Sequence, residues 1–478
     1  MGIPFILPAI VPALDPDFRP AVLANRAFRA AVKASGIARP LRLALEQADG
    51  SVFHYATEIF AEDETPISKP ARAPADHEIG AASAANFTYV ERLVKFLLWS
   101  WGGWRIYFDG PPVLGEQLAQ HFRETATGKF DSHLIGEKIY DRPIEVVVTS
   151  DLPPARAATK PLGRHLNGCR IGFDLGGSDR NVAAVIDGQV VFSDETVWDP
   201  YFHPDPQYHF DGIMDSLKRA AAHLPRVDAI GGSAAGVYVN NRVKVASLFR
   251  GVAPDVFDNR VKNLFFEVQR AMGGVPLEVV NDGEVTALAG SMSLGRNAVL
   301  GLALGTSLAA GYVTREGNIT SWLNELAFAP VDYHPAAPRD EWSGDYGVGA
   351  RYFSQQAVGR LLPAAGIELD AKLPLPEKLK HVQALMAQGD ERARRLYQTI
   401  GIHLGYAIAH YADFYDFDHV LILGRVTSGS GGDIIIEGAK AVLKLEFPEL
   451  AGRTAFHTPD EKDKRHGQAV AAASLPQI

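Results

Sequence analysis

Three turns in this chain place carboxylates, glycines and hydroxyls directly after apolar runs. In the stretch CRIGFDLGGSDRNVAAVIDG, Asp174 precedes Gly176, Gly177 and Ser178. Glycines let the backbone approach an anion closely, so that amide N–H groups and the serine hydroxyl can donate to it. The carboxylate of Asp174 is suited to holding Mg²⁺ through water. The alternative is a plain hairpin with a glycine turn.

A second turn repeats this arrangement. Gly305, Thr306 and Ser307 lie between apolar runs in LGLALGTSLAAGYV. Two such hairpins facing each other would hold a triphosphate from both sides. Neither turn has the GxxxxGK[ST] pattern, so the sequence predicts phosphate binding by a solution other than a P-loop.

The third turn is Asn281-Asp282-Gly283, which follows PLEVV and precedes EVTALAGSMSLG. Ligand chemistry in α/β folds is found at the carboxyl ends of strands, where Asp282 is expected. As a general base, Asp282 would accept the proton of an attacking hydroxyl during phosphoryl transfer. The alternative is that the turn only caps a helix.

The elements that must position these turns alternate between strands and helices from about residue 166 onward, which predicts an α/β fold. Before that point we expect a separate α+β module, built from a helix, a hairpin that turns at Asp49-Gly50, a loop, a helix, a strand and a further helix. The first helix is predicted at 21–35 and the loop at 63–85. The second helix is predicted at 86–101, the strand at 104–110 and the last helix at 111–125. Trp99, Trp101 and Trp104 are expected to be packed in its core.

Composition excludes several functional classes. The chain has 478 residues, one cysteine and a formal charge of -9, with 47% hydrophobic and 22% charged residues. One cysteine rules out a disulfide framework and an all-cysteine metal site within the chain. The negative charge disfavours nucleic acid as a partner. No apolar run reaches the roughly 18 residues of a membrane helix, so we expect a cytoplasmic protein without a membrane partner.

Taken together and in order, five segments resemble motifs of the ROK family of sugar kinases, part of the actin, sugar-kinase and heat-shock-chaperone ATPase superfamily. They are DLGGSD, GGSAAGVYV, VVNDGEVTALAG, LALGTSLAAGYV and LILGRVTSGSGG. The resemblance runs from Cys169 to Ile478. It implies two RNase-H-like, actin-like ATPase lobes around a cleft, in addition to the N-terminal α+β module.

The resemblance also implies domains, ligands and roles. The N-terminal module would span 1–165, the first lobe 166–290 and the second 291–457, with a C-terminal helix at about 458–475 returning to the first lobe. ATP and Mg²⁺ would be the cofactors. Asp174 would lie near the metal and Asp282 would be the base, while Asn281, Asp282 and Glu325 would bind the acceptor. The nucleotide and its phosphates would contact Asp174, Gly176, Gly177, Ser178, Gly305, Thr306, Ser307, Gly424, Gly429, Gly431 and Gly432.

The chain departs from the family pattern where the sugar should bind. The family's Glu-x-x-His motif is represented by Glu325, but Phe328 stands at the histidine position. The following loop has no cysteine, so no zinc site is expected. Ser354 is nearest to the place of a further sugar-binding glutamate.

Three functions remain open from the sequence. The first is an ATP- and Mg²⁺-dependent kinase that phosphorylates a hydroxyl of a sugar or sugar-like molecule, acting as a homodimer. The second is a non-catalytic sugar- or nucleotide-binding regulator, and the third is an ATPase that needs no acceptor. The N-terminal module would serve as a lid, a dimer surface or a scaffold for the first lobe.

Overall fold

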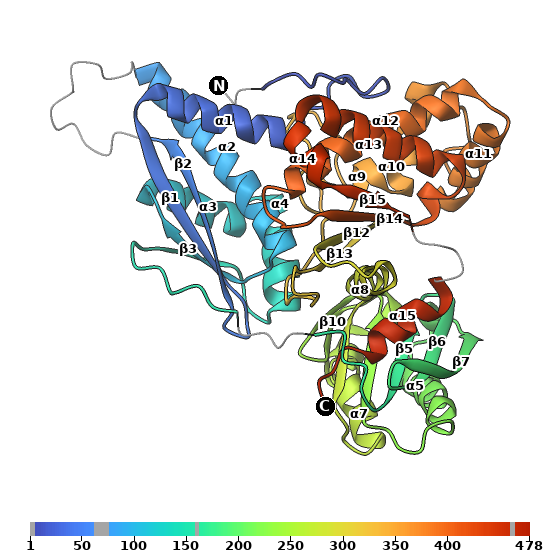
Figure 1. The fold of residues 1–478 in the computed structure, drawn as a ribbon. Coiled ribbons are helices and arrows are strands. Elements are labelled where there is room, and N and C mark those ends of the chain that lie inside the picture. The colour runs from blue at the N-terminus through green and yellow to red at the C-terminus, as the bar shows by residue number, and fades with distance from the viewer. Residues whose placement is uncertain (1–4, 62–75, 158–161, 459–463) are drawn as a thin grey trace.

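The computed structural model describes residues 5–61, 76–157, 162–458 and 464–478. Two α/β lobes and an N-terminal α+β region each contain one main sheet. Figure 1 shows the N-terminal region beside the upper lobe, which carries β12–β15, with the lobe that carries β5–β8 below. We call the lobe with β5 the first lobe and the lobe with β12 the second lobe.

The first lobe has a five-stranded sheet with the order β11-β8-β5-β6-β7. β5 pairs with β6 as an antiparallel hairpin and with β8 in parallel, and β8 pairs in parallel with β11. The strands are β5 (Cys169–Leu175), β6 (Asp179–Ile186), β7 (Gln189–Val197), β8 (Ala229–Ala234) and β11 (Leu277–Asn281). Its helices include α5 (Pro206–Ala221) and α7 (Leu264–Ala271), and a separate ribbon pairs β9 (Val237–Val239) with β10 (Arg242–Val245).

The second lobe repeats this plan with the strand order β13-β12-β14-β15. β12 and β13 form the antiparallel hairpin, and β12, β14 and β15 run parallel. The strands are β12 (Val299–Leu304), β13 (Leu308–Val313), β14 (His419–Leu423) and β15 (Ala455–His457). The helices are α9 (Ala350–Phe353), α10 (Gln355–Ala365), α11 (Leu375–Ala387), α12 (Glu391–Tyr411), α13 (Ser430–Glu446) and α14 (Pro448–Arg453). In both lobes, therefore, a glycine turn joins the first two strands.

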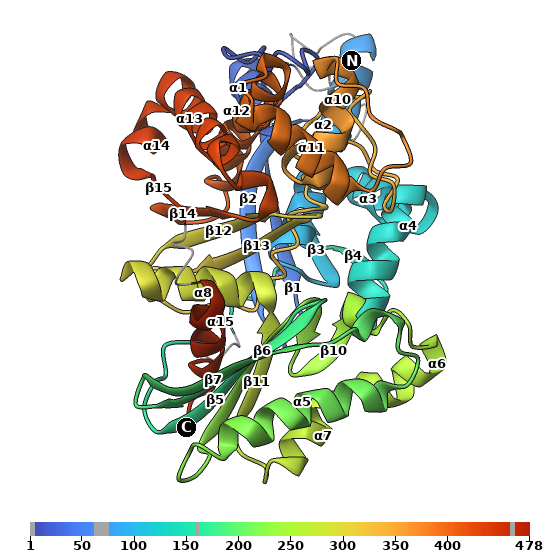
Figure 2. The same cartoon turned by 90° about the vertical axis from the view of Figure 1, so that its right-hand side faces the viewer.

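Two helices connect the lobes. α8 (Asp282–Leu294) packs on β12 and β13, and α15 (Lys464–Ala473) packs on β5, β6, β8 and α8. Figure 2 shows α15 directly below α8. A Cβ atom on Gly172 would lie 1.7 Å from the backbone oxygen of Ala469, and one on Gly231 would lie 1.6 Å from that of Ala472. Glycine at these two strand positions therefore lets α15 lie close to the sheet.

The N-terminal region has a sheet with the order β2-β1-β3-β4. Its strands are β1 (Ala38–Glu46), β2 (Val52–Phe60), β3 (Arg105–Asp109) and β4 (Glu145–Val148), and its helices are α1 (Ala21–Ser35), α2 (Asp76–Ser100), α3 (Pro112–Glu124), α4 (Ala126–Asp131) and η1 (Ser132–Ile139). The predicted first helix and the hairpin at Asp49-Gly50 are confirmed. The loop prediction is wrong for 76–85, which is helical, and 63–75 lie outside the described residues. Alanine in this stretch favours a helix more than its charged and proline-rich context suggested.

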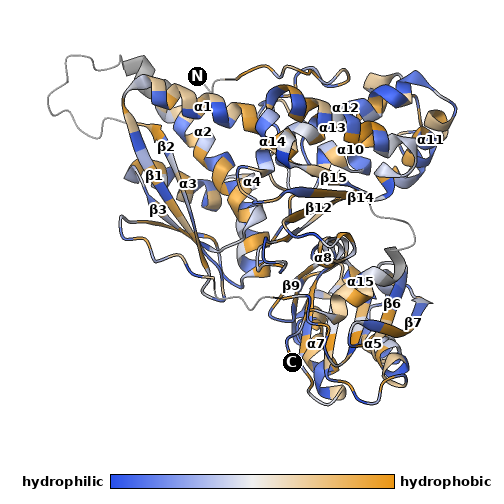
Figure 3. Cartoon of the chain, viewed as in Figure 1, coloured by the Kyte–Doolittle hydropathy of each residue, from blue (hydrophilic) through white to orange (hydrophobic). Residues whose placement is uncertain are grey.

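The N-terminal region and the second lobe share one hydrophobic core. The rings of Phe96 in α2 and Phe414 lie 4.2 Å apart, and Tyr55 in β2 stacks on Phe414 at 5.5 Å. Arg29 in α1 forms an ion pair with Asp413 at 3.0 Å. In Figure 3, β12 is mainly in the hydrophobic colour, as its burial requires. The N-terminal region is therefore no scaffold for the first lobe alone, because its main packing partner is the second lobe.

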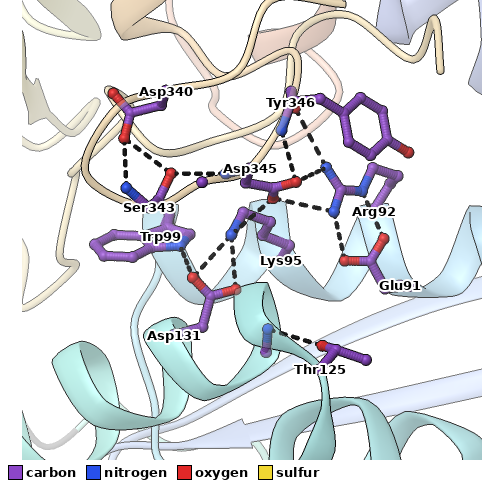
Figure 4. A network of polar contacts seen from close by, with 12 residues as sticks. Glu91, Arg92, Lys95, Trp99, Thr125, Asp131, Asp340, Ser343, Asp345 and Tyr346 are labelled. Carbon is purple, nitrogen blue, oxygen red and sulfur yellow. Dashed lines mark hydrogen bonds and ion pairs between the residues drawn. The ribbon is translucent and has the colours of Figure 1, made fainter. Parts of the chain in front are cut away.

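A buried network of charges fixes the loop 340–346 to α2 (Figure 4). The carboxylate of Asp345 accepts from the guanidinium of Arg92 at 3.1 and 3.2 Å and lies 3.0 Å from Nζ of Lys95. Lys95 also donates to Asp131 at 2.7 Å. This loop lies in the segment where the resembling family carries cysteines for zinc, and here ion pairs hold it.

Candidate functional site

Asp174 is the central residue of a polar cluster at the carboxyl end of β5. It lies beside Ser233 of the parallel strand β8, and the Ser233 hydroxyl donates to Oδ1 of Asp174 at 2.5 Å. Gln468 of α15 donates through Nε2 to the same Oδ1 at 3.1 Å. Burial raises the pKa of Asp174 to about 7, helped by the negative charge of Asp282 and opposed by the Ser233 hydrogen bond.

The carboxylate of Asp174 leaves one oxygen for a hydrated cation. Both described hydrogen bonds to its carboxylate reach Oδ1, which leaves Oδ2 to accept from metal-bound water. A divalent cation nearby would favour the charged carboxylate that burial disfavours. Among the described residues, no three or more His, Cys, Asp or Glu side chains are arranged to hold a metal ion between them. Phosphate oxygens and water would therefore have to complete the shell of a Mg²⁺ ion.

Asp282 begins α8, and its neighbour Asn281 is the helix cap. Oδ1 of Asn281 accepts from the backbone N–H of Gly283 at 2.7 Å, and its Nδ2 donates to the backbone oxygen of Gly236 at 2.7 Å. The sequence predicted that Asn281 binds the acceptor, whereas its described bonds here are structural. Oδ1 of Asp282 accepts from Gly283 at 3.0 Å, and burial raises the pKa of Asp282.

Gly283 explains how Asp282 reaches the boundary between the lobes. A Cβ atom on Gly283 would lie 2.6 Å from the backbone oxygen of Ala310 in β13. Helix α8 therefore packs its first turn directly on the second lobe. Asn281 can thus cap the helix while its neighbour Asp282 remains the candidate base.

Glu325 lies near Asp282. The pKa of Glu325 is raised to about 7, first by burial and then by the negative charge of Asp282. Its backbone N–H donates to the carbonyl of Trp99 at 2.9 Å, which fixes the residue to the end of α2. Asp282 is thus close enough to both Asp174 and Glu325 for its negative charge to raise the pKa of each.

The two residues that depart from the family pattern are used in packing. The ring of Phe328 lies 4.5 Å from that of Trp99 and 5.3 Å from that of Trp342, so the position expected to hold a histidine belongs to an aromatic cluster. Trp99, Trp101 and Trp104 are buried, as predicted. The hydroxyl of Ser354 caps α10 by accepting from Gln356 at 3.0 Å and is fully buried. Neither residue replaces the missing sugar-binding side chain.

The turn between β5 and β6 directly follows Asp174. The backbone oxygen of Gly176 accepts from the indole N–H of Trp198 at 2.8 Å, and the hydroxyl of Ser178, which is exposed, donates to Asp179 at 2.9 Å. A Cβ atom on Gly177 would lie 1.9 Å from the hydroxyl of Tyr201. The turn is therefore supported on one side by aromatic residues and exposes its serine.

The matching turn of the second lobe has two exposed hydroxyl residues, Thr306 and Ser307. Gly305 is held because its N–H donates to the oxygen of Ser307 at 3.0 Å and its oxygen accepts from Gln355 at 2.9 Å. A Cβ atom on Gly424, which has a φ of 104°, would lie 2.5 Å from the oxygen of Leu304. Gly305 and Gly424 therefore lie together at the carboxyl ends of β12 and β14.

The remaining predicted glycines are Gly429, Gly431 and Gly432, of which one faces open space and two are packed against other parts of the chain. Gly429 has a φ of 71° and nothing within 4 Å of the position of a Cβ atom. At Gly431 that position is 2.6 Å from the ring of Tyr397, and at Gly432 it is 2.1 Å from the oxygen of Thr427. Gly429 is thus the one of these three whose own surface is open, while Gly431 and Gly432 allow α13 to pack closely.

A pocket lies next to Asp282, between the two lobes and the N-terminal region. Asn281, Glu284 and Glu325 line it, together with the aromatic side chains of Tyr238 and Trp322. Glu284 is buried, accepts a hydrogen bond from Nδ2 of Asn324 and has a pKa raised to about 8 by burial. Carboxylates and aromatic faces suit a ligand rich in hydroxyl groups.

Sequence reasoning missed several residues of this site. Ser233 and Gln468 hold Asp174, and Asn324 holds Glu284. Ser233 had a readable signal, because it ends a strand-like run before a glycine-containing turn. Gln468 and Asn324 had none, because a polar residue in a helix or a loop does not indicate what it contacts.

Comparison with solved structures shows the fold. The ROK hexokinase from Thermus thermophilus superposes with a TM-score of 0.50 at 18% identity, covering 64% of this chain and 98% of that one. A ROK family glucokinase from Streptomyces griseus, solved with glucose and AMPPNP, gives 0.46 at 20% identity, covering 64% and 98%. A ROK family transcriptional regulator, a homologue of the E. coli MLC protein, gives 0.49 at 19%, covering 65% and 79%. No family model and no curated protein matches the sequence.

The two-lobed actin-like ATPase fold expected from the sequence is therefore confirmed, in the form seen in ROK proteins. Both lobes start with an antiparallel hairpin and continue with parallel strands, as their matching strand orders show. Within the described residues, no helix combines the length and apolar character needed to span a membrane.

Proposed function

We propose that this protein is an ATP- and Mg²⁺-dependent kinase that phosphorylates a hydroxyl group of a sugar or sugar-like molecule. The observation that carries the proposal is the position of Asp282, which begins α8 beside a pocket and influences the pKa of both Asp174 and Glu325. Gln468 joins the two sides of this site, because it donates to Asp174 and lies 3.4 Å from the backbone oxygen of Asp282. The likeness to a hexokinase fold supports the same reaction class.

In the proposed reaction, the acceptor hydroxyl loses its proton to the carboxylate of Asp282 as its oxygen attacks the γ-phosphorus of ATP. The bond from that phosphorus to the bridging oxygen breaks, and ADP leaves. The raised pKa of Asp282 makes this carboxylate a stronger base than an exposed aspartate. Mg²⁺, when held near Asp174, would neutralise charge on the phosphates. Amide and hydroxyl donors of the two glycine turns would bind the phosphate oxygens.

The remaining roles belong to the same proposal. Gly176, Gly177, Ser178, Gly305, Thr306 and Ser307 contact phosphates, and Gly424 and Gly429 lie near the nucleoside. The N-terminal module spans 1–165, the first lobe spans 166–290 with 458–475, and the second lobe spans 291–457. The protein acts as a homodimer in the cytoplasm.

A second candidate is a regulator that binds a sugar or nucleotide without transferring phosphate. The specific observation in its favour is that Phe328 is packed in an aromatic cluster and the Asn281 amide is engaged in capping. The acceptor site then lacks two polar groups that the family resemblance predicted there, a histidine at position 328 and the amide of Asn281.

The test is ADP release from Mg-ATP with a panel of hexoses, amino sugars and polyols. We expect one acceptor to stimulate release and Asp282→Asn to reduce it by about 10²- to 10⁴-fold, the usual contribution of a general base. Asp255→Asn, at an exposed position of the first lobe, is the matched control and should keep full activity. Binding of an acceptor without any transfer would favour the regulator, and ATP hydrolysis that ignores every acceptor would favour an ATPase.

A further inference from the structure

The pocket beside Asp282 has a wall that the N-terminal region supplies. The turn between β1 and β2, with Gln47, Ala48 and Asp49, lines the same pocket as Asn281 and Glu325. Tyr140, at the end of η1, lines it as well. The N-terminal region therefore reaches the place where the proposed acceptor would bind.

Gln47 ties this turn to the segment that carries Glu325. Its side chain is 3% exposed, and its Nε2 donates to the backbone oxygen of Ser321 at 3.0 Å and to that of Trp101 at 2.6 Å. An amide nitrogen of glutamine has two N–H donors, so both are used. The contact joins residues 274 positions apart in sequence.

The end of α2 holds the same segment through its backbone. The N–H of Asn324 donates to the carbonyl of Ser100, and that of Glu325 donates to the carbonyl of Trp99, both at 2.9 Å. Carbonyls in the last turn of a helix have no partner within that helix, so they are available to accept. The backbone at Glu325 is therefore positioned by the N-terminal region.

The N-terminal region also reaches the first lobe at this pocket. Lys244 in β10, whose side chain is 5% exposed, donates to the carboxylate of Asp141, the residue after Tyr140. β9, which pairs with β10, supplies Val237, Tyr238 and Val239 to the lining of the pocket. One region thus contacts both lobes around one pocket.

We propose that the N-terminal region forms the acceptor-side wall of the site, with Gln47 as a positioning residue for the Glu325 segment and Ala48 as the residue that limits acceptor size. This inference rests on the proposed kinase function. Ala48 is exposed and lines the pocket, so a larger side chain there meets the ligand before it meets the core. Gln47 touches no reacting atom and acts through the backbone of Ser321.

The test compares steady-state kinetics of Ala48→Trp and Gln47→Met with those of the unaltered chain, using the acceptor found in the panel. We expect Ala48→Trp to raise the acceptor KM by more than about tenfold, and more for larger acceptors, because it narrows the pocket. Gln47→Met keeps the length of the side chain but loses both donors, and we expect the acceptor KM to rise by about tenfold. The KM for ATP should stay within about twofold in both variants, a split that general unfolding would not produce.

Glu58→Met is the matched control, because Glu58 is exposed on β2 of the same hairpin. It should leave both KM values unchanged. If Gln47→Met fails to fold, Ala48→Trp alone decides. An unchanged acceptor KM in Ala48→Trp overturns the inference while leaving the kinase in place. No transfer by the unaltered chain to any acceptor overturns the proposed function, and this inference fails with it.

Discussion

Replacing Lys95 by methionine should destabilise the N-terminal region and the second lobe together. Lys95 is 1% exposed and lies between Asp131 and Asp345 at 2.7 and 3.0 Å. Its removal leaves Asp345 with Arg92, but among the described residues it leaves the Asp131 side chain with the indole N–H of Trp99 alone, at 3.0 Å. Breaking a buried ion pair on one side costs about 3–5 kcal/mol, because a buried charge is left without compensation.

The size of the thermal shift follows from that free energy. A change of 1 kcal/mol moves the transition of a large domain by roughly 2–4 °C, so we expect the transition of this unit to fall by roughly 6–20 °C at pH 8. Differential scanning calorimetry at pH 5 and pH 8 measures it. Lys138→Met is the control, because Lys138 is exposed in η1 and should shift the transition by less than about 1 °C.

The pH dependence has a definite sign. Burial raises the pKa of Asp131 even with Lys95 present, whereas two cations hold the pKa of Asp345 below its usual range. Without Lys95 the pKa of Asp131 rises further. A carboxyl whose pKa is raised in the folded state stabilises that state when it is protonated. The stability that Lys95→Met loses therefore grows as pH rises from the pKa of Asp131 in the unfolded chain, near 4, to its pKa in the folded chain. The shift should therefore be smaller at pH 5 than at pH 8.

A second substitution tests the cause. Asp131→Asn, added to Lys95→Met, removes the stranded charge and keeps an oxygen for the indole of Trp99. The double variant should melt above the single one at pH 8. The reasoning is refuted if Lys95→Met melts within about 1 °C of the unaltered chain, or if the double variant melts below the single variant at both pH values.

Two further perturbations test the packing and the pocket. Gly231→Ala would push a Cβ atom against the backbone oxygen of Ala472 and displace α15, so we expect a lower melting temperature of the first lobe. Gly467→Ala is the control and should have little effect, because the space around Gly467 is open. Equal melting temperatures of the two variants would contradict the close approach of α15 to the sheet. Burial raises the pKa of Glu284 to about 8, so the stability that its protonated form gives the folded chain is lost as pH rises towards 8. The Glu284→Gln variant does not lose this stability. The melting temperature of the variant should therefore exceed that of the unaltered chain by more at pH 9 than at pH 5. A pH-independent difference would contradict this account of Glu284.

The local features of this protein can be predicted from short stretches of its sequence. The turn after each first strand, the helix that starts at Asp282 and the hairpin at Asp49-Gly50 follow from glycine, asparagine and apolar runs over a few residues. These features depend on neighbours in the chain, so their pattern is visible without a structure. The two-lobed fold was implied by the resemblance of five ordered motifs between Cys169 and Ile478 to the ROK family. The start of α2 was missed because composition alone suggested a loop.

Which of these residues contact one another, and which are used for packing, depends on contacts between distant parts of the chain. Asp174 is held by Gln468 and Glu325 is fixed by Trp99, pairs that lie hundreds of positions apart in the chain. Phe328 joined an aromatic cluster because α2 presents Trp99 to it. Such contacts are set by how the sheets and helices pack, and burial then sets the pKa of each carboxylate. The local pattern of a sequence predicts neither the long-range contacts nor the pKa values. Both depend on surfaces that come together only in the folded chain.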